Sequence, residues 1–181
     1  MAYNIPDYTT KDFSFGPGVL RIGATATTPM TDIGACRGAV LHISRGVLAV
    51  MQGSPAVEVK RYAISEEVSI ELEGIEWNLD NIAFALGTGT TTHVGFTETL
   101  ALGGDMEFAE KALLYRHIQP DGSTIDICLY QVQPDPTLDI DFKNEPHTFP
   151  YKFFAQEATS DFENAALAAK QKLMKITRVR A

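Results

Sequence analysis

The stretch from Ile64 to Glu73 constrains the fold more than any other part of the sequence, because its apolar side chains recur at every second residue. Val68, Ile70 and Leu72 alternate with Glu67, Ser69, Glu71 and Glu73. Successive side chains of a β-strand point to opposite faces. The pattern therefore predicts a strand with one face in a hydrophobic core and the other face rich in carboxylates.

Shorter strand patterns, separated by turn residues, recur along the rest of the chain. They are predicted at 19–24, 39–43, 112–118 and 124–132, with others near 94–102, 138–142 and 149–153. Short strands at this spacing are typical of an antiparallel β-sandwich or barrel. The predicted fold class is thus mainly β.

A hairpin is predicted at about 46–62, because apolar residues precede a Gly-Ser-Pro turn and Val57 and Val59 then alternate with polar residues. Its first strand and turn comprise Val47, Leu48, Val50, Met51, Gln52, Gly53, Ser54 and Pro55. The four large apolar residues of this set are too apolar for an isolated loop. We expect them to be buried against a partner.

One short flanking helix is predicted at about 78–87. Asn78 is a favourable N-cap, and Gly87 suits the left-handed position that follows a helix. Trp77 and Ile82 have the spacing of a hydrophobic staple across the helix start.

A second helix is predicted at about 161–172. Ser160 and Glu163 have the spacing of a capping box, and apolar residues recur at helical spacing after them. The following residues, 173–179, either extend this helix or form a final strand.

Length and charge restrict the function. The 181 residues suit one domain at 18–181, preceded by a polar and aromatic arm at 1–17. The net charge of -8 argues against a protein that wraps nucleic acid. No apolar run approaches the roughly 20 residues of a membrane span, and the first residues lack the features of a signal peptide. Cys36 and Cys128 are expected to be buried thiols without a disulfide.

No motif for catalysis, metal binding or cofactor binding is found. The four histidines have no ligand spacing, and nucleophile elbows and phosphate loops are missing. Paired carboxylates such as Asp139 and Asp141 have a spacing compatible with glycosidase chemistry, but such rows are far more often solvated strand faces. We therefore predict no catalytic residue, no metal and no cofactor.

Four segments together resemble the bacteriophage tail tube (major tail) protein family, which is related to the inner-tube proteins of type VI secretion. They are the opening segment 15–34, the hairpin at 46–61, the strand at 68–72 with the helix 78–87, and the closing strand 146–153. The segment 160–172 has no counterpart in this pattern.

The resemblance implies a β-sandwich or barrel subunit of which six copies form a ring. Stacked rings would form a hollow tube that delivers the genome from the virion tail, after assembly in the host cytoplasm. The implied partners are other copies and sheath, tape-measure, terminator and baseplate or tip proteins, with transient passage of DNA and no membrane insertion. The hairpin would bridge subunits. An acidic channel wall would be lined first by Glu67, Ser69, Glu71 and Glu73, and secondly by Asp126 and Tyr130.

Two other functions compete with this one. The chain is also compatible with the inner tube of another contractile injection or secretion device. A monomeric β-sandwich binding module, for example for carbohydrate, would instead expose Trp or Tyr platforms. An image of the purified protein separates rings or tubes from a monomer.

Overall fold

The computed structural model describes residues 18–29, 31–34, 36–76, 78–104, 107–135, 137–140 and 148–180. These residues are mainly antiparallel β-structure, as predicted. The elements are β1 (Gly18–Ala24), β2 (Thr31–Asp32), β3 (Cys36–Gln52), β4 (Val57–Gly74), α1 (Leu79–Leu86), β5 (Thr90–Val94), β6 (Thr97–Ala101), β7 (Lys111–Ile118), β8 (Thr124–Pro134), β9 (Phe149–Ala155) and β10 (Met174–Val179). The predicted arm at 1–17 lies outside the described residues.

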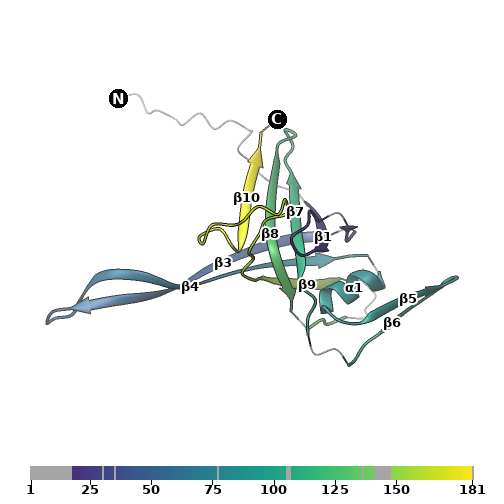
Figure 1. Cartoon of the computed structure of the whole chain (residues 1–181), viewed down its shortest axis with the longest axis horizontal. Coiled ribbons are helices and arrows are strands. Elements are labelled where there is room, and N and C mark those ends of the chain that lie inside the picture. The colour runs from purple at the N-terminus through teal and green to yellow at the C-terminus, as the bar shows by residue number, and fades with distance from the viewer. Residues whose placement is uncertain are drawn as a thin grey trace.

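Strand β8 connects two differently oriented parts of one sheet. The strand order is β2-β1-β7-β8-β9-β4-β3, and β10 pairs with β8 beside this path. The first part of β8 lies between β7 and β10, whereas its last residues, 132–134, pair with β9. Figure 1 shows β1, β7, β8 and β10 running across the direction of β3, β4 and β9. The two parts pack over a common core, but the strand path ends at β2 and β3, so the sheet is not a closed barrel.

The alternation predicted for β4 is confirmed. Val68, Ile70 and Leu72 are buried, and Ile70 and Leu72 pair directly with Phe153 and Tyr151 of β9. The core continues across the other part of the sheet through Leu20, Ile22, Leu113, Leu129 and Val132. Cross-strand pairs of aromatic and β-branched or aliphatic residues are a main source of sheet stability.

The predicted helix is also confirmed. Asn78 Oδ1 accepts hydrogen bonds from the backbone N–H groups of Asp80 (2.9 Å) and Asn81 (3.4 Å). Gly87 closes the helix in the left-handed conformation, with φ of 67°, and its N–H donates to the carbonyl of Phe84. The staple cannot be assessed, because Trp77 lies outside the described residues.

The predicted helix at 161–172 is wrong. Asp161 Oδ1 accepts hydrogen bonds from the N–H groups of Glu163 (2.9 Å) and Ala165 (2.8 Å). Asn164 is left-handed, with φ of 62°, and Ser160 and Ala166 form an isolated antiparallel bridge. The aspartate side chain thus stabilises a local turn by accepting hydrogen bonds from nearby backbone amides in place of a helix. The next residues form β10, one of the two conformations expected for 173–179.

Two other predicted strands differ from the structure. The pattern at 94–102 is divided by a turn at Gly95 and Phe96, so that β5 and β6 form a separate two-stranded hairpin. Residues 137–140 contain no strand, and the rest of the strand predicted at 138–142 lies outside the described residues. Among the described residues, no helix has the length and apolar character needed to cross a membrane.

Candidate assembly surfaces

The distal parts of β3 and β4 form a two-stranded ribbon, residues 45–66, that projects far from the body (Figure 1). Strand β9 pairs with β4 only from Ser69 onward, so no third strand of the described part of the chain lies beside the ribbon. Every residue from Val47 to Glu67 is exposed. The exposed large apolar residues are Val47, Leu48, Val50, Met51, Val57, Val59, Tyr62 and Ile64. The predicted hairpin is therefore the end of a longer one, and its apolar residues are uncovered in the single chain.

The apolar residues of the ribbon occupy both of its faces. Leu48 pairs with Tyr62 and Val50 pairs with Lys60 on one face, whereas Val47 pairs with Ala63 on the other. The Nζ atom of Lys60 lies 4.8 Å from the ring centroid of Tyr62. Register shifts after Gly46 and Val50 mark β-bulges, which increase the local twist of a ribbon. If the ribbon folded back onto its own domain, only one of its two apolar faces could be covered.

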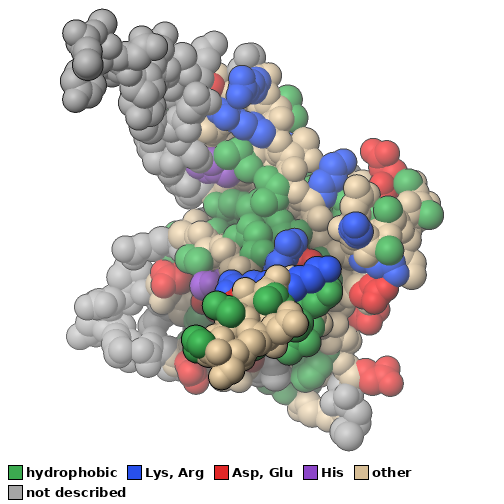
Figure 2. Space-filling model, turned by 90° about the vertical axis from the view of Figure 1, so that its left-hand side faces the viewer, with side chains coloured by type: hydrophobic (Ala, Val, Ile, Leu, Met, Phe, Trp, Pro, Cys, Tyr) green, Lys and Arg blue, Asp and Glu red, His purple; other side chains and the backbone are tan. Residues whose placement is uncertain are grey.

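Such a ribbon is expected to have a partner. A two-stranded hairpin is at best marginally stable in water, and contiguous exposed apolar surface marks an interaction site. Both ribbon edges also carry backbone groups that have no strand beside them among the described residues. Residues Gln52, Gly53, Ser54 and Pro55 form the exposed tip, as predicted. Figure 2, which views the molecule from the ribbon end, shows hydrophobic side chains interspersed with Lys and Arg there.

A second projection, formed by β5 and β6, was not predicted. Its two-residue turn has Gly95 with φ of 63° at the first position, followed by Phe96, whose side chain is fully exposed. Glycine at the first central position is typical of a tight hairpin turn. In the sequence, the Gly-Phe pair between two Thr-rich segments indicates this turn. The apolar residues on either side of the pair made the whole segment resemble one continuous strand.

His93 lies between two carboxylates and connects this hairpin to α1. Its Nε2 atom is 3.4 Å from Asp80 Oδ2 of the helix, and its Nδ1 atom is 3.6 Å from Glu98 Oε1 of β6. Hydrogen bonds from Thr91 and then His93 hold the pKa of Asp80 below its usual value. These contacts connect the hairpin to the helix.

The predicted acidic face of β4 is present, but it is partly neutralised. Glu71 forms an ion pair with Lys152 of β9 and lies 3.6 Å from His42 of β3. The hydrogen bond from Lys152 holds the pKa of Glu71 below its usual value. Glu67 and Glu73 are exposed, whereas Ser69 is only 5% exposed. The accessible anions of this face are therefore the three glutamates, with one of them paired.

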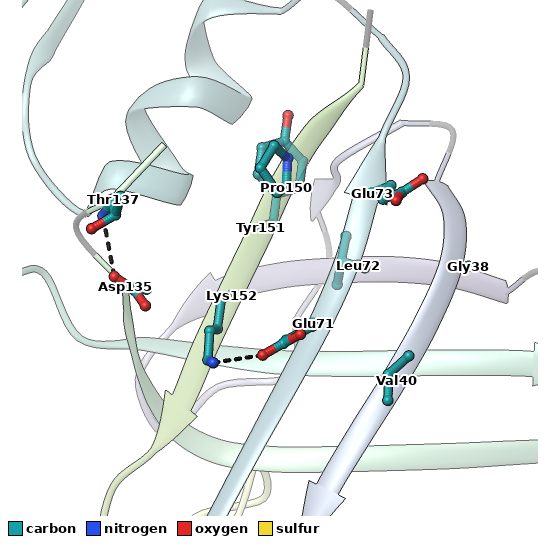
Figure 3. A pocket seen from close by; sticks show the side chains of 10 residues that line it. All are labelled: Gly38, Val40, Glu71, Leu72, Glu73, Asp135, Thr137, Pro150, Tyr151 and Lys152. Atoms are coloured by element: carbon teal, nitrogen blue, oxygen red, sulfur yellow. Dashed lines mark hydrogen bonds and ion pairs between the residues drawn. The ribbon is translucent and has the colours of Figure 1, made fainter. Parts of the chain in front are cut away.

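Beside these glutamates, the same face has an open groove of about 540 Å³. Figure 3 shows Gly38 and Val40 on one side, Asp135 and Thr137 on the other, and the Glu71–Lys152 ion pair across the strands between them. Its lining is mostly apolar and includes neither a cysteine nor a histidine. The groove can accept an apolar side chain or a segment of backbone.

The two weaker channel candidates lie apart from this face, on β8. Asp126 accepts two hydrogen bonds from Arg116, both of 2.7 Å, and this raises the pKa of Arg116. Tyr130 is 4% exposed, and its ring packs edge-on against Phe162 at 5.3 Å between centroids. Tyr130 is therefore covered by its own chain and cannot line a channel in this conformation.

Both cysteines are free and half-buried, whereas the sequence predicted buried thiols. Burial raises the pKa of Cys36 and of Cys128 to about 11. Within the described part of the chain, no group of three or more His, Cys, Asp or Glu residues is arranged to hold a metal ion.

No protein-family model matches the sequence, and no curated protein is significantly similar to it. The candidate surfaces are thus identified by the chain's own residues, namely the apolar ribbon, the Phe96 hairpin and the glutamate face.

Proposed function

We propose that this protein is the structural subunit of a phage tail tube, in which copies form rings of six and the stacked rings enclose a channel for genome delivery. The observation that supports this proposal best is the ribbon. Its apolar residues lie on both faces, its edges have no neighbouring strand among the residues that the structure describes, and it projects away from its own core.

Assembly of identical copies would satisfy this surface. A neighbouring copy can cover the apolar faces, and pairing of free strand edges would remove the aggregation hazard that they present. Within the described residues, strands β3 and β10 each have one strand partner, so each offers an edge for such pairing. A projection that binds a different surface on the next copy makes a head-to-tail contact, and such contacts produce closed rings or open filaments.

The glutamate face of β4 is our candidate for the channel wall. Duplex DNA carries one negative charge per roughly 1.7 Å of length. Like charge on the wall would limit adhesion of the moving genome. Glu67 and Glu73 would contribute most, because Lys152 compensates the charge of Glu71.

The experiment is electron microscopy of the purified protein in negative stain, over a range of concentrations and with tail preparations as reference. Rings or tubes are expected. A strict monomer of 19.8 kDa at all concentrations, together with its absence from tails, would refute the proposal and favour the monomeric binding module.

A deletion tests the role of the ribbon. Removal of 50–58 takes away only exposed residues, so the subunit should stay folded but fail to assemble. The matched control replaces the polar tip residues Gln52 and Ser54 with Ala, which should leave assembly intact. Normal tubes from the deletion variant would contradict this role.

A further inference from the structure

The ribbon and the β5–β6 hairpin leave the body on opposite sides of the molecule (Figure 1). Both carry exposed apolar residues, which for the hairpin are Val94 and Phe96. Because they point away from each other, they cannot cover one another within a single chain. In a head-to-tail row of copies, each would meet the other at every junction.

The hairpin is attached to the body near its base, and its turn has a defined geometry. The two-residue turn at Gly95 fixes the position of Phe96. At its other end, Leu100 packs against the core and His93 contacts Asp80 of α1. Attachment of the base reduces the conformational entropy that the hairpin would lose when it binds.

The charges of the two projections are complementary. The β5–β6 hairpin itself, residues 90–101, carries one acid, Glu98, and no Lys or Arg. The ribbon instead carries Arg45, Lys60 and Arg61 against two glutamates. Arg45 and Arg61 are paired with those glutamates, whereas Lys60 lies over Tyr62, on the face that also bears Leu48 and Val50. Opposite charges on two surfaces steer their association and fix its register.

We propose that the β5–β6 hairpin of one copy packs on the ribbon of a second copy, with Phe96 against the Leu48–Tyr62 face and Glu98 near Lys60. The proposal rests on the self-assembly proposed above and names the surface that receives the ribbon. The contact joins two different surfaces, so it propagates in one direction around a ring or along a filament.

A cross-linking experiment tests the contact directly. Phe96→Cys and Leu48→Cys are made in separate chains with different tags, then mixed and treated with the thiol oxidant diamide. The native thiols should remain silent, because burial raises the pKa of each to about 11. A disulfide between the two differently tagged chains is expected in the mixture, and neither variant alone should form one. Ile118→Cys, at an exposed position of β7, replaces Phe96→Cys in the control and should give no cross-link.

A complementation experiment tests the head-to-tail direction. Phe96→Ser and the double variant Leu48→Ser/Val50→Ser should each stay folded and self-associate more weakly by a factor of about 10 to 100, since each removes apolar side chains from the contact. In a mixture of the two variants, the intact hairpin of the double variant can still bind the intact ribbon of Phe96→Ser. Each pair then has no second intact contact, so two-chain species should form and longer assemblies should not.

The outcomes separate this inference from the proposed function. If wild-type protein and Phe96→Ser assemble equally well and the Phe96→Cys/Leu48→Cys cross-link does not form, the proposed contact is wrong. The tube proposal is unaffected by this result. Absence of both assembly and cross-link in every sample would overturn both.

Discussion

Tyr151 provides the sharpest test of the core. Its side chain is 2% exposed, and its hydroxyl group is buried without a hydrogen-bond partner among the described residues. Burial raises the pKa of this hydroxyl to about 12, with smaller contributions from Cys36 and Glu76. The ring packs so closely on Gly74 that a Cβ atom there would lie 2.4 Å from Tyr151 Cε2. The substitution Tyr151→Phe removes the hydroxyl and keeps this ring contact.

The expected result is greater stability. A buried polar group without a partner costs about 1–3 kcal/mol, because it loses its hydrogen bond to water on folding. Allowing for relaxation around the ring, we expect Tyr151→Phe to raise the free energy of unfolding by about 1 kcal/mol. For a domain of this size, that corresponds to a rise in Tm of roughly 2–4 °C.

Equilibrium unfolding in urea, at concentrations where the protein is monomeric, measures this change. The control is Tyr62→Phe, which removes a hydroxyl from an exposed ribbon residue and should change the free energy by less than about 0.5 kcal/mol. A loss of 1 kcal/mol or more in Tyr151→Phe would show that the hydroxyl has a stabilising partner and would contradict this prediction.

Three further predictions concern charge and thiol chemistry. Lys152 keeps the pKa of Glu71 below its ordinary value of 4.5, so their pairing stabilises the fold above that pH and is lost as the pH falls through the lower folded value. Lys152→Met should therefore make the free energy of unfolding less dependent on pH in acid, as measured by urea unfolding between about pH 2 and 6; an unchanged slope would contradict the pairing. Cys36 and Cys128 should react slowly with Ellman's reagent at pH 8 in the folded protein, because with a pKa of about 11 only about one thiol in a thousand is ionised; unfolding in urea should make both react quickly, and rapid reaction without urea would exclude their burial. Replacing Glu67, Glu71 and Glu73 with Lys should leave tubes intact but slow DNA ejection, most strongly at low salt; ejection at the normal rate would remove these residues from the channel wall.

The elements that the sequence predicted correctly are those whose signals are local. The alternation around Ile70 determines which face of β4 is buried, whatever packs against it. The helix α1 is bounded by Asn78 and Gly87, whose capping contacts lie within the same few residues. Neither prediction depends on a distant part of the chain.

Some failures have local causes, namely the turns at Asp161 and Gly95, and others involve contacts between residues far apart in the sequence. The segment after Ser160 has helical spacing, but the Asp161 turn and the contact of Phe162 with Tyr130 override it. The same contact buries Tyr130, which alternation alone had placed on a surface. Likewise, the neutralisation of Glu71 could not be predicted from its neighbours in sequence. Its partner Lys152 lies on β9, about eighty residues later. Periodicity identifies the face of a strand, and only the tertiary structure shows what covers that face.

The order in which the strands pair has a consequence for biosynthesis. Strands β3 and β4, which form the ribbon, are neighbours in sequence and can pair as soon as Gly74 has been synthesised. In contrast, Gly18 of β1 can pair only after His117 has been synthesised, and Leu72 of β4 only after Tyr151. Pairings between such distant segments are slow, because a long loop must close first. A growing chain on the ribosome therefore displays its adhesive ribbon before its core can close. Neighbouring nascent chains on one messenger RNA would meet through their ribbons at this stage, so the yield of correctly folded subunits should depend on how quickly β9 and β10 emerge.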